Sequence, residues 1–279
     1  MATAFSENLT AEQQSQVLQV FQQFQHPSLQ KDLIALNTLK KVEKGGDVLR
    51  IELQLPFAWN TGVEQVKQQL SDALLKATDS KEIKWIVNYQ IATLKRANNQ
   101  PAVKGVKNII AVTSGKGGVG KSSVSVNLAL SLQAQGARVG ILDADIYGPS
   151  IPHMLGAPHQ RPTSPDNQHI TPIKAYGLSA NSIGFLMDED NATIWRGPMA
   201  SSALSQLLNE TLWDSLDYLV IDMPPGTGDI QLTLSQQIPV TGAVVVTTPQ
   251  DIALLDAVKG VSMFERVSVP VLGIVAVSY

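Results

Sequence analysis

The stretch SGKGGVGKSS, residues 114–123, is a glycine-rich segment that matches the phosphate-binding pattern G-x-x-x-x-G-K-[ST] from Gly115 to Ser122. The apolar run NIIAVTS before it predicts a strand, and the run KSSVSVNLALSLQAQG after it predicts a helix. In such a unit the backbone N–H groups of the loop point inward around a phosphate, and the helix dipole also favours negative charge. The stretch therefore predicts a nucleotide-binding strand, loop and helix.

Each residue of this loop has an expected role. Lys121 is expected to reach the β- and γ-phosphates as a catalytic group, and the Ser122 hydroxyl is expected to bind Mg²⁺. The residues expected to bind the nucleotide are Gly115, Lys116, Gly117, Gly118, Val119, Gly120, Lys121, Ser122 and Ser123. No N-K-x-D stretch that would read guanine follows a late strand, so we expect the nucleotide to be ATP.

Acidic residues at the ends of two other apolar runs fit the same reaction. Asp222 ends the run YLVID and is expected to organise Mg²⁺ together with Ser122. Asp143 and Asp145 end the run ILDAD, where a carboxylate pair would orient the attacking water and hold a magnesium-bound water. We expect Asp145 to be the catalytic member of the pair. For Asp143, capping of the next turn explains the residue as well as a magnesium site does.

From residue 108 onward, short continuous apolar runs alternate with longer amphipathic segments. The strand candidates are NIIAVTS, RVGILDAD, DYLVIDMP, GAVVVTTP and VPVLGIVAV, and the intervening helices are expected to begin near Lys121, Met199, Asp229 and Asp251. Continuous β-branched runs separated by helices are typical of a parallel sheet covered on both faces. Residues 158–186 break this pattern and predict a loop and a hairpin inserted at the strand ends. The predicted fold class is α/β.

The sequence before the glycine-rich loop predicts a second, smaller domain. Residues 1–94 read as helix, strand, strand, helix, strand, which predicts a small α+β domain. Residues 95–107 are polar and contain Pro101 and Gly105, so they read as a linker. Residues 108–279 then form the nucleotide-binding domain.

Composition narrows the class of protein. Of the 279 residues 44% are apolar and 16% are charged, which is enough apolar content for a sizeable core. The net charge of −3 argues against a nucleic-acid partner that binds by bulk electrostatics. The chain lacks a secretory signal and any apolar run long enough to span a bilayer, so we expect a cytoplasmic protein without a membrane partner. It contains no cysteine, which excludes thiolate ligands for a metal or cluster.

Several motifs carry a resemblance to a known family. KGGVGKS resembles the deviant phosphate loop of the MinD, ParA and nitrogenase-iron-protein class, whose hallmark is the extra lysine, here Lys116. Within that class, the stretches WDSLDYLVIDMPPGTGD (213–229), DADIYGPSIPHMLG (143–156) and WRGPM (195–199) resemble the Mrp/ApbC/Nbp35 family of iron–sulfur cluster carriers. Residues 1–94 are similar to the MIP18-type domain fused to bacterial Mrp proteins, although QHPSLQKDL stands where an Asp-Pro-Glu stretch is common.

The resemblance implies a SIMIBI/MinD-like P-loop NTPase fold and a slow, Mg²⁺-dependent ATPase that works as a homodimer and delivers clusters to apoproteins. It implies that Lys116 crosses a face-to-face dimer to the partner's nucleotide and acts catalytically there. It also implies a 4Fe–4S cluster held by a Cys-x-x-Cys beyond the strand VPVLGIV. This sequence ends there with AVSY, so we infer a truncated chain that has no cluster ligands of its own.

Two other functions remain open from the sequence. One is a positioning ATPase like MinD or ParA, which would need a C-terminal amphipathic helix or a basic surface, and neither is visible. The other is a nucleotide-binding adaptor without a cluster role.

Overall fold

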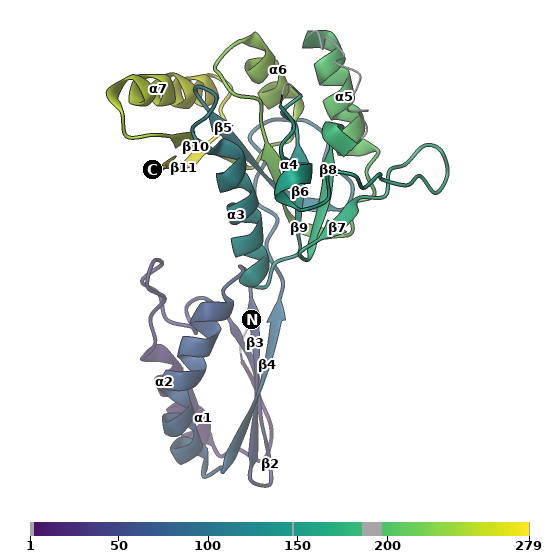
Figure 1. Ribbon diagram of the computed structural model, residues 1–279. Coiled ribbons are helices and arrows are strands. Elements are labelled where there is room, and N and C mark those ends of the chain that lie inside the picture. Colours follow the sequence, from purple (N-terminus) through teal and green to yellow (C-terminus); the bar gives the residue numbers. More distant parts are fainter. Residues whose placement is uncertain (1–2, 147, 186–196, 279) are drawn as a thin grey trace. The chain divides into compact units, whose positions relative to one another are not determined.

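The computed structural model describes residues 3–146, 148–185 and 197–278, and the chain divides into two compact units, Met1–Ala92 and Thr93–Tyr279 (Figure 1). The segment 95–107, expected to be a linker, belongs to the second unit. Its Ala97 N–H donates to the Val240 carbonyl oxygen at 2.8 Å. The Asn98 side-chain amide donates to the Ile238 carbonyl oxygen, also at 2.8 Å.

The first unit is a four-stranded sheet with two helices. Its elements are β1 (Ala4–Phe5), α1 (Ala11–Gln22), β2 (Leu39–Gly45), β3 (Val48–Leu55), α2 (Asn60–Thr78) and β4 (Glu82–Tyr89), with strand order β1-β2-β3-β4. The β2–β3 pair is antiparallel, whereas β1–β2 and β3–β4 are parallel. The small α+β fold predicted from periodicity is thus present, with the two-residue strand β1 added. That strand is too short for a periodic signal.

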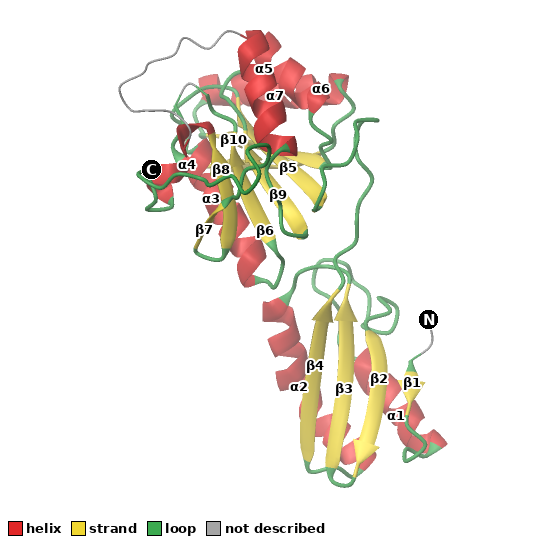
Figure 2. Ribbon diagram, turned by 90° about the vertical axis from the view of Figure 1, so that its right-hand side faces the viewer, coloured by secondary structure: helices red, strands yellow, loops and turns green. Residues whose placement is uncertain are grey.

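Apolar periodicity explains the core of the first unit. The alternating side chains Leu49, Ile51, Leu53 and Leu55 of β3 are all buried, as period two predicts for a sheet covered on one face. Helices α1 and α2 pack their apolar stripes, which include Phe21 and Leu74, against side chains of β3 in one hydrophobic cluster. Figure 2 shows both helices on one side of this sheet.

The second unit is built on a seven-stranded sheet in the order β11-β10-β5-β9-β6-β8-β7. Its strands are β5 (Val106–Ser114), β6 (Val139–Asp143), β7 (Ile173–Ala175), β8 (Leu178–Ser182), β9 (Leu216–Asp222), β10 (Gly242–Thr247) and β11 (Val271–Ala276). Its helices are α3 (Lys121–Ala134), α4 (Ile151–Met154), α5 (Gly197–Asn209), α6 (Asp229–Gln237) and α7 (Asp251–Arg266). All neighbouring strands are parallel except β7 and β8, which confirms the predicted α/β fold with a mostly parallel sheet.

Helices cover both faces of this sheet (Figure 2). Side chains of α5, α6 and α7, such as Leu207, Leu234 and Phe264, form one cluster with Ile109 and Ile221 of the central strands. Helix α3 packs against β5, β6 and β9, and its buried residues are not members of that cluster. Burial on both faces explains why these strands read as continuous apolar runs in the sequence.

The structure corrects the expectation for residues 158–186. The hairpin β7–β8 is not an insertion at the strand ends, because β8 pairs in parallel with β6 and extends the sheet. Every residue of β8 is buried, although its sequence LSANS contains few large apolar side chains. The predicted hairpin is therefore present, but the small side chains of β8 give no continuous apolar run that would have indicated a buried strand of the main sheet. Trp195 and Arg196 of the WRGPM motif lie outside the described residues.

Within the described part of the chain, no helix combines the length and the apolar content needed to cross a bilayer.

Candidate nucleotide-binding site

The glycine-rich loop joins the carboxyl end of β5 to the first residue of α3. The Ser114 hydroxyl donates to the Lys116 carbonyl oxygen at 2.8 Å, which closes the first turn of the loop. Gly118 and Gly120 have φ angles of +78° and +89°, a region that glycine enters without strain. Gly115 is needed for a different reason, because a Cβ atom there would lie 2.6 Å from the backbone of α7. The loop is therefore a tight backbone cradle at a helix N-terminus.

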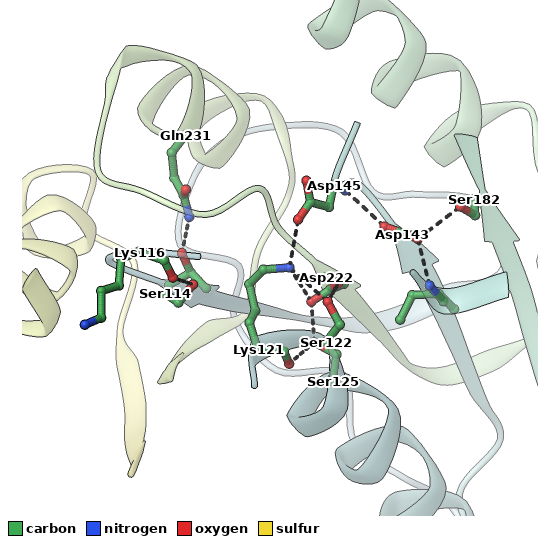
Figure 3. Close-up of polar contacts among 12 residues, drawn as sticks. Ser114, Lys116, Lys121, Ser122, Ser125, Asp143, Asp145, Ser182, Asp222 and Gln231 are labelled. Carbon is green, nitrogen blue, oxygen red and sulfur yellow. Dashed lines mark hydrogen bonds and ion pairs between the residues drawn. The ribbon is translucent and has the colours of Figure 1, made fainter. Parts of the chain in front are cut away.

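Lys121 lies at the centre of a charged cluster behind this loop. Its side chain is buried, with its ammonium nitrogen 2.9 Å from Oδ1 of Asp222 and 3.4 Å from Oδ2 of Asp145 (Figure 3). Asp222 is completely buried, so the lysine compensates a carboxylate that would otherwise be strongly destabilising. The sequence prediction that these three residues share one site agrees with this arrangement.

Two hydroxyl groups complete the surroundings of the Asp222 carboxylate. Ser122 Oγ donates to Oδ2 at 2.6 Å, and Ser125 Oγ donates to Oδ1 at 2.7 Å. Ser122 was expected near Asp222, but sequence reasoning missed Ser125. The available signal was its position three residues after Ser122, which places both hydroxyls on one side of α3.

Strand register brings the acidic residues to the same level. Asp222 of β9 pairs with Asp143 of β6 on one side and with Val112 of β5 on the other. Paired residues on neighbouring strands point to the same face of a sheet. The carboxyl ends of β5, β6 and β9 therefore place the phosphate loop and both acidic runs side by side.

Asp143 faces the protein backbone. Its Oδ1 accepts from the Asp145 N–H at 3.1 Å, and its Oδ2 accepts from the Ile151 N–H and the Ser182 hydroxyl, each at 3.1 Å (Figure 3). Burial raises the pKa of Asp143 to about 7, and the Asp222 carboxylate acts in the same direction, while the hydrogen bonds from Ile151 and Asp145 oppose them. All three donors come from the segment after β6 or from the end of β8, so this carboxyl group holds that segment in place.

The remaining predicted residues of the loop differ in exposure. Val119 is buried, whereas Lys116 and Ser123 are exposed. The Lys116 side chain points away from Lys121 and Asp222 in Figure 3. The structure thus separates the two lysines of the motif, with one inside the charged cluster and the other outside it.

The donor set fits a nucleotide with a hard divalent cation. At Gly117 and Gly118 a Cβ atom would meet nothing within 4 Å, so the loop is open on that side. A hydroxyl and carboxylates, as supplied by Ser122, Asp145 and Asp222, are the oxygen ligands that Mg²⁺ prefers. Among the described residues no group of three or more histidine, aspartate or glutamate side chains forms a separate metal centre, and the chain has no cysteine.

Comparison with known proteins gives consistent results. Residues 105–277 match the family described as ParA, NUBPL iron-transfer P-loop NTPase. The iron–sulfur cluster carrier protein of Haemophilus influenzae is 90% identical over 275 residues, covering 99% of this chain and 74% of that protein. The protein of the same name from Escherichia coli is 66% identical over 252 residues, covering 90% and 68%.

A solved structure of a nucleotide-binding protein is also similar to this chain. A nucleotide-binding protein of Archaeoglobus fulgidus, in complex with ADP, superposes with a TM-score of 0.54 at 40% identity, covering 62% of this chain and 67% of that one. The family match spans the glycine-rich loop and both acidic strand ends described above. The resemblance seen in the sequence is therefore confirmed, and the chain belongs to the ParA family of iron-transfer P-loop NTPases, among the iron–sulfur cluster carrier proteins.

Proposed function

We propose that this chain is the ATP-binding and ATP-hydrolysing part of a carrier that passes iron–sulfur clusters to apoproteins. The observation that carries the proposal is the buried cluster in which Lys121, Ser122 and Asp222 meet directly behind an open glycine-rich loop. A lysine held between carboxylates at this position is ready to exchange them for the β- and γ-phosphates of ATP. Family membership supplies the cargo, since the relatives are named iron–sulfur cluster carriers.

In the proposed reaction the residues of this chain divide the work. The loop N–H groups and the Lys121 ammonium hold the phosphates, and Ser122 with Asp222 would hold Mg²⁺. When bound, Mg²⁺ neutralises charge that develops on the phosphate oxygens. Asp145 orients the attacking water, and the hydrogen bond from its N–H to Asp143 fixes the backbone that carries it. Asp143 itself then acts on the segment after β6 rather than as a direct ligand.

Lys116 has a different proposed role, which requires a second copy of the chain. Its side chain is exposed and is directed away from the charged cluster around Lys121 in its own chain. In a face-to-face homodimer it would reach the nucleotide of the partner, where a cation stabilises the charge on the transferring phosphoryl group. Hydrolysis would then be slow and would depend on dimer formation.

The cargo is bound outside the residues of this chain. With no cysteine, the chain offers no thiolate for a 4Fe–4S cluster, and we propose that thiolates elsewhere in the full-length carrier ligate it. The relatives are longer, since the chain covers 74% of the H. influenzae protein and 68% of the E. coli protein. We propose a cytoplasmic carrier whose partners are recipient apoproteins, without nucleic acid or membrane.

The first test is ATP binding and turnover with magnesium. We expect Lys121→Ala to lower turnover by at least about 100-fold, because it removes a cation from the developing phosphate charge. Lys104→Ala is the matched control, since Lys104 is an exposed lysine of the same unit, outside the cluster, and its variant should keep normal turnover. ATP hydrolysis that persists in Lys121→Ala would overturn the assignment of the site.

The carrier role needs a separate experiment. The full-length protein is reconstituted with iron and sulfide without oxygen, and cluster transfer to an apoprotein is followed by absorption. We expect a cluster to form and to be transferred. Failure to acquire or transfer a cluster, with ATPase activity intact, would favour a positioning ATPase or a nucleotide-binding adaptor.

A further inference from the structure

The segment between Asp222 and helix α6, residues 223–228, runs beside the end of β5, where the phosphate loop begins. Two backbone hydrogen bonds hold it there, from the Met223 N–H to the Val112 carbonyl oxygen at 2.9 Å and from the Gly226 N–H to the Ser114 carbonyl oxygen at 2.8 Å. Both acceptors belong to the end of β5, which leads directly into the phosphate loop. The position of this segment is therefore tied to the strand that carries the nucleotide site.

A buried glutamine strengthens this connection. Gln231 of α6 is 2% exposed, and Figure 3 shows its side chain directed toward the end of β5 beside Ser114. With its amide nitrogen toward the segment, it donates to the Gly226 carbonyl oxygen at 2.8 Å and to the Pro224 carbonyl oxygen at 2.5 Å. Its amide oxygen then accepts from the Thr113 hydroxyl. One side chain thus joins α6, the segment after Asp222 and the end of β5.

The hydrogen-bonding groups around this side chain match the amide of a glutamine. An amide provides two donors and one acceptor from the same side chain, which matches two carbonyl oxygens and one hydroxyl. A carboxylate at this position would direct lone pairs at the two carbonyl oxygens. An apolar side chain would leave these carbonyl groups without a buried partner, and such groups favour alternative conformations that expose them to water.

We propose that Gln231 is a positioning residue for ATP turnover, which holds the segment after Asp222 in register with the phosphate loop. The inference rests on the proposed ATPase function and adds a residue that touches neither the phosphates nor the cation. Its effect passes through residues 223–228 to the Asp222 carboxylate and the space above the loop. Loss of the contact lowers the fraction of molecules in which this segment is correctly placed for the chemical step.

The test compares variants that break the contact with variants that keep it. Gln231→Leu and Gln231→Glu break it in two ways, and Thr113→Val removes only the hydroxyl that donates to Gln231. Thr113→Ser retains that hydroxyl and is the conservative variant. Gln237→Leu changes an exposed glutamine of the same helix and is the matched control.

Two measurements separate positioning from general destabilisation. We expect kcat for ATP to fall about 10-fold or more in both Gln231 variants, with KM within about 3-fold of wild type, because substrate binding does not use this contact. Thr113→Val should show a smaller fall, and Thr113→Ser and Gln237→Leu should match wild type. Hydrogen exchange at the Gly226 amide should accelerate by about 10-fold in Gln231→Leu and not in Gln237→Leu.

Each outcome decides the matter. Unchanged kcat and unchanged Gly226 exchange in the Gln231 variants overturn the proposal, and so does a change in which kcat and KM follow the loss of folded protein. If Gln231→Leu does not fold, Thr113→Val gives the same comparison with one bond removed. If wild type does not hydrolyse ATP, the proposed function fails, while faster Gly226 exchange in Gln231→Leu still establishes that the Gln231 contact holds residues 223–228 in place.

Discussion

The two units of this chain treat buried polar groups in opposite ways. In the described part of the first unit, the buried polar side chains are Thr38 and Thr78, and each hydroxyl donates to a nearby backbone carbonyl at 2.8 Å. The second unit buries charged side chains both at the amino end of β9, where Asp217 lies, and in a group at the carboxyl edge of its sheet, namely Lys121, Asp143, Asp145 and Asp222. Burying charge is costly unless it is compensated. Asp217 is compensated by ion pairs with Lys107 and Arg138, so the group at the carboxyl edge is the one that marks the candidate site.

The sheets of the two units also differ in how many of their faces are covered. Residues of β4 in the first unit alternate between exposed and half-buried, which is typical of a sheet with one solvated face. All residues of β6 in the second unit are buried. A strand covered on both faces leaves its carboxyl end as the place for functional side chains, and Asp143, itself completely buried, lies at that end of β6. The comparison predicts that damage to the first unit reduces stability alone, whereas damage to that edge reduces turnover.

The largest expected effect is on stability in the first unit. Leu74 is completely buried against the β3 side chains, so Leu74→Ala should destabilise this unit by about 2–5 kcal/mol. Hydrogen exchange should become faster in β3 and stay unchanged in β5. ATP turnover should remain at the wild-type level. The matched control is Leu29→Ala, because Leu29 is 47% exposed in the same unit. A parallel loss of turnover in Leu74→Ala would show that the two units are energetically coupled.

A smaller effect is expected from the exposed lysine of the phosphate loop. Lys116→Ala should lower turnover about 10–100-fold, because a cation supplied by the partner would stabilise the transferring phosphoryl group. It should not change the melting temperature, since this side chain is exposed. The measurement is specific activity against protein concentration for wild type and variant. Constant specific activity down to monomer concentrations, together with no effect of Lys116→Ala, would refute the role in a dimer.

Local patterns were enough to predict much of this molecule. The glycine-rich pattern located the loop and Lys121, and strand-end acids located Asp145 and Asp222, because parallel strands bring their carboxyl ends to one edge. Apolar periodicity gave the α/β class and helix starts at Lys121 and Asp251. These features depend on residues that are close together in the sequence, where spacing determines geometry.

The features that were missed depend on distant partners. Ser125 is 97 residues from Asp222, and Gln231 is 118 residues from Thr113, so no short window of sequence contains either pair. The sequence pattern is compatible with Asp143 either as a magnesium ligand or as a cap of the next turn, and only the tertiary structure reveals its three hydrogen-bond donors. The hairpin in residues 158–186 was predicted, but the pairing of β8 with β6 was not, because the small side chains of β8 give no continuous apolar run, although the strand is buried.

The last prediction concerns Asp143, whose raised pKa makes the stability of the second unit depend on pH. The carboxyl group has an ordinary pKa of 3.8, and burial raises the folded value to about 7. Between these values the folded state retains a proton that the unfolded chain has lost. The stabilisation from this group is therefore complete below pH 3.8 and is lost as pH rises through 7, with a slope of at most about 1.4 kcal/mol per pH unit.

Urea unfolding of the second unit at a series of pH values measures this slope. Asp143→Asn should remove this component of the slope and lower stability at neutral pH, because an amide nitrogen in place of Oδ2 accepts neither from the Ile151 N–H nor from the Ser182 hydroxyl. Titration of the labelled Asp143 carboxyl carbon should show a midpoint near 7. A midpoint near 4 would mean that the hydrogen bonds from the segment after β6 outweigh burial, and this edge would then hold a full complement of negative charge at neutral pH.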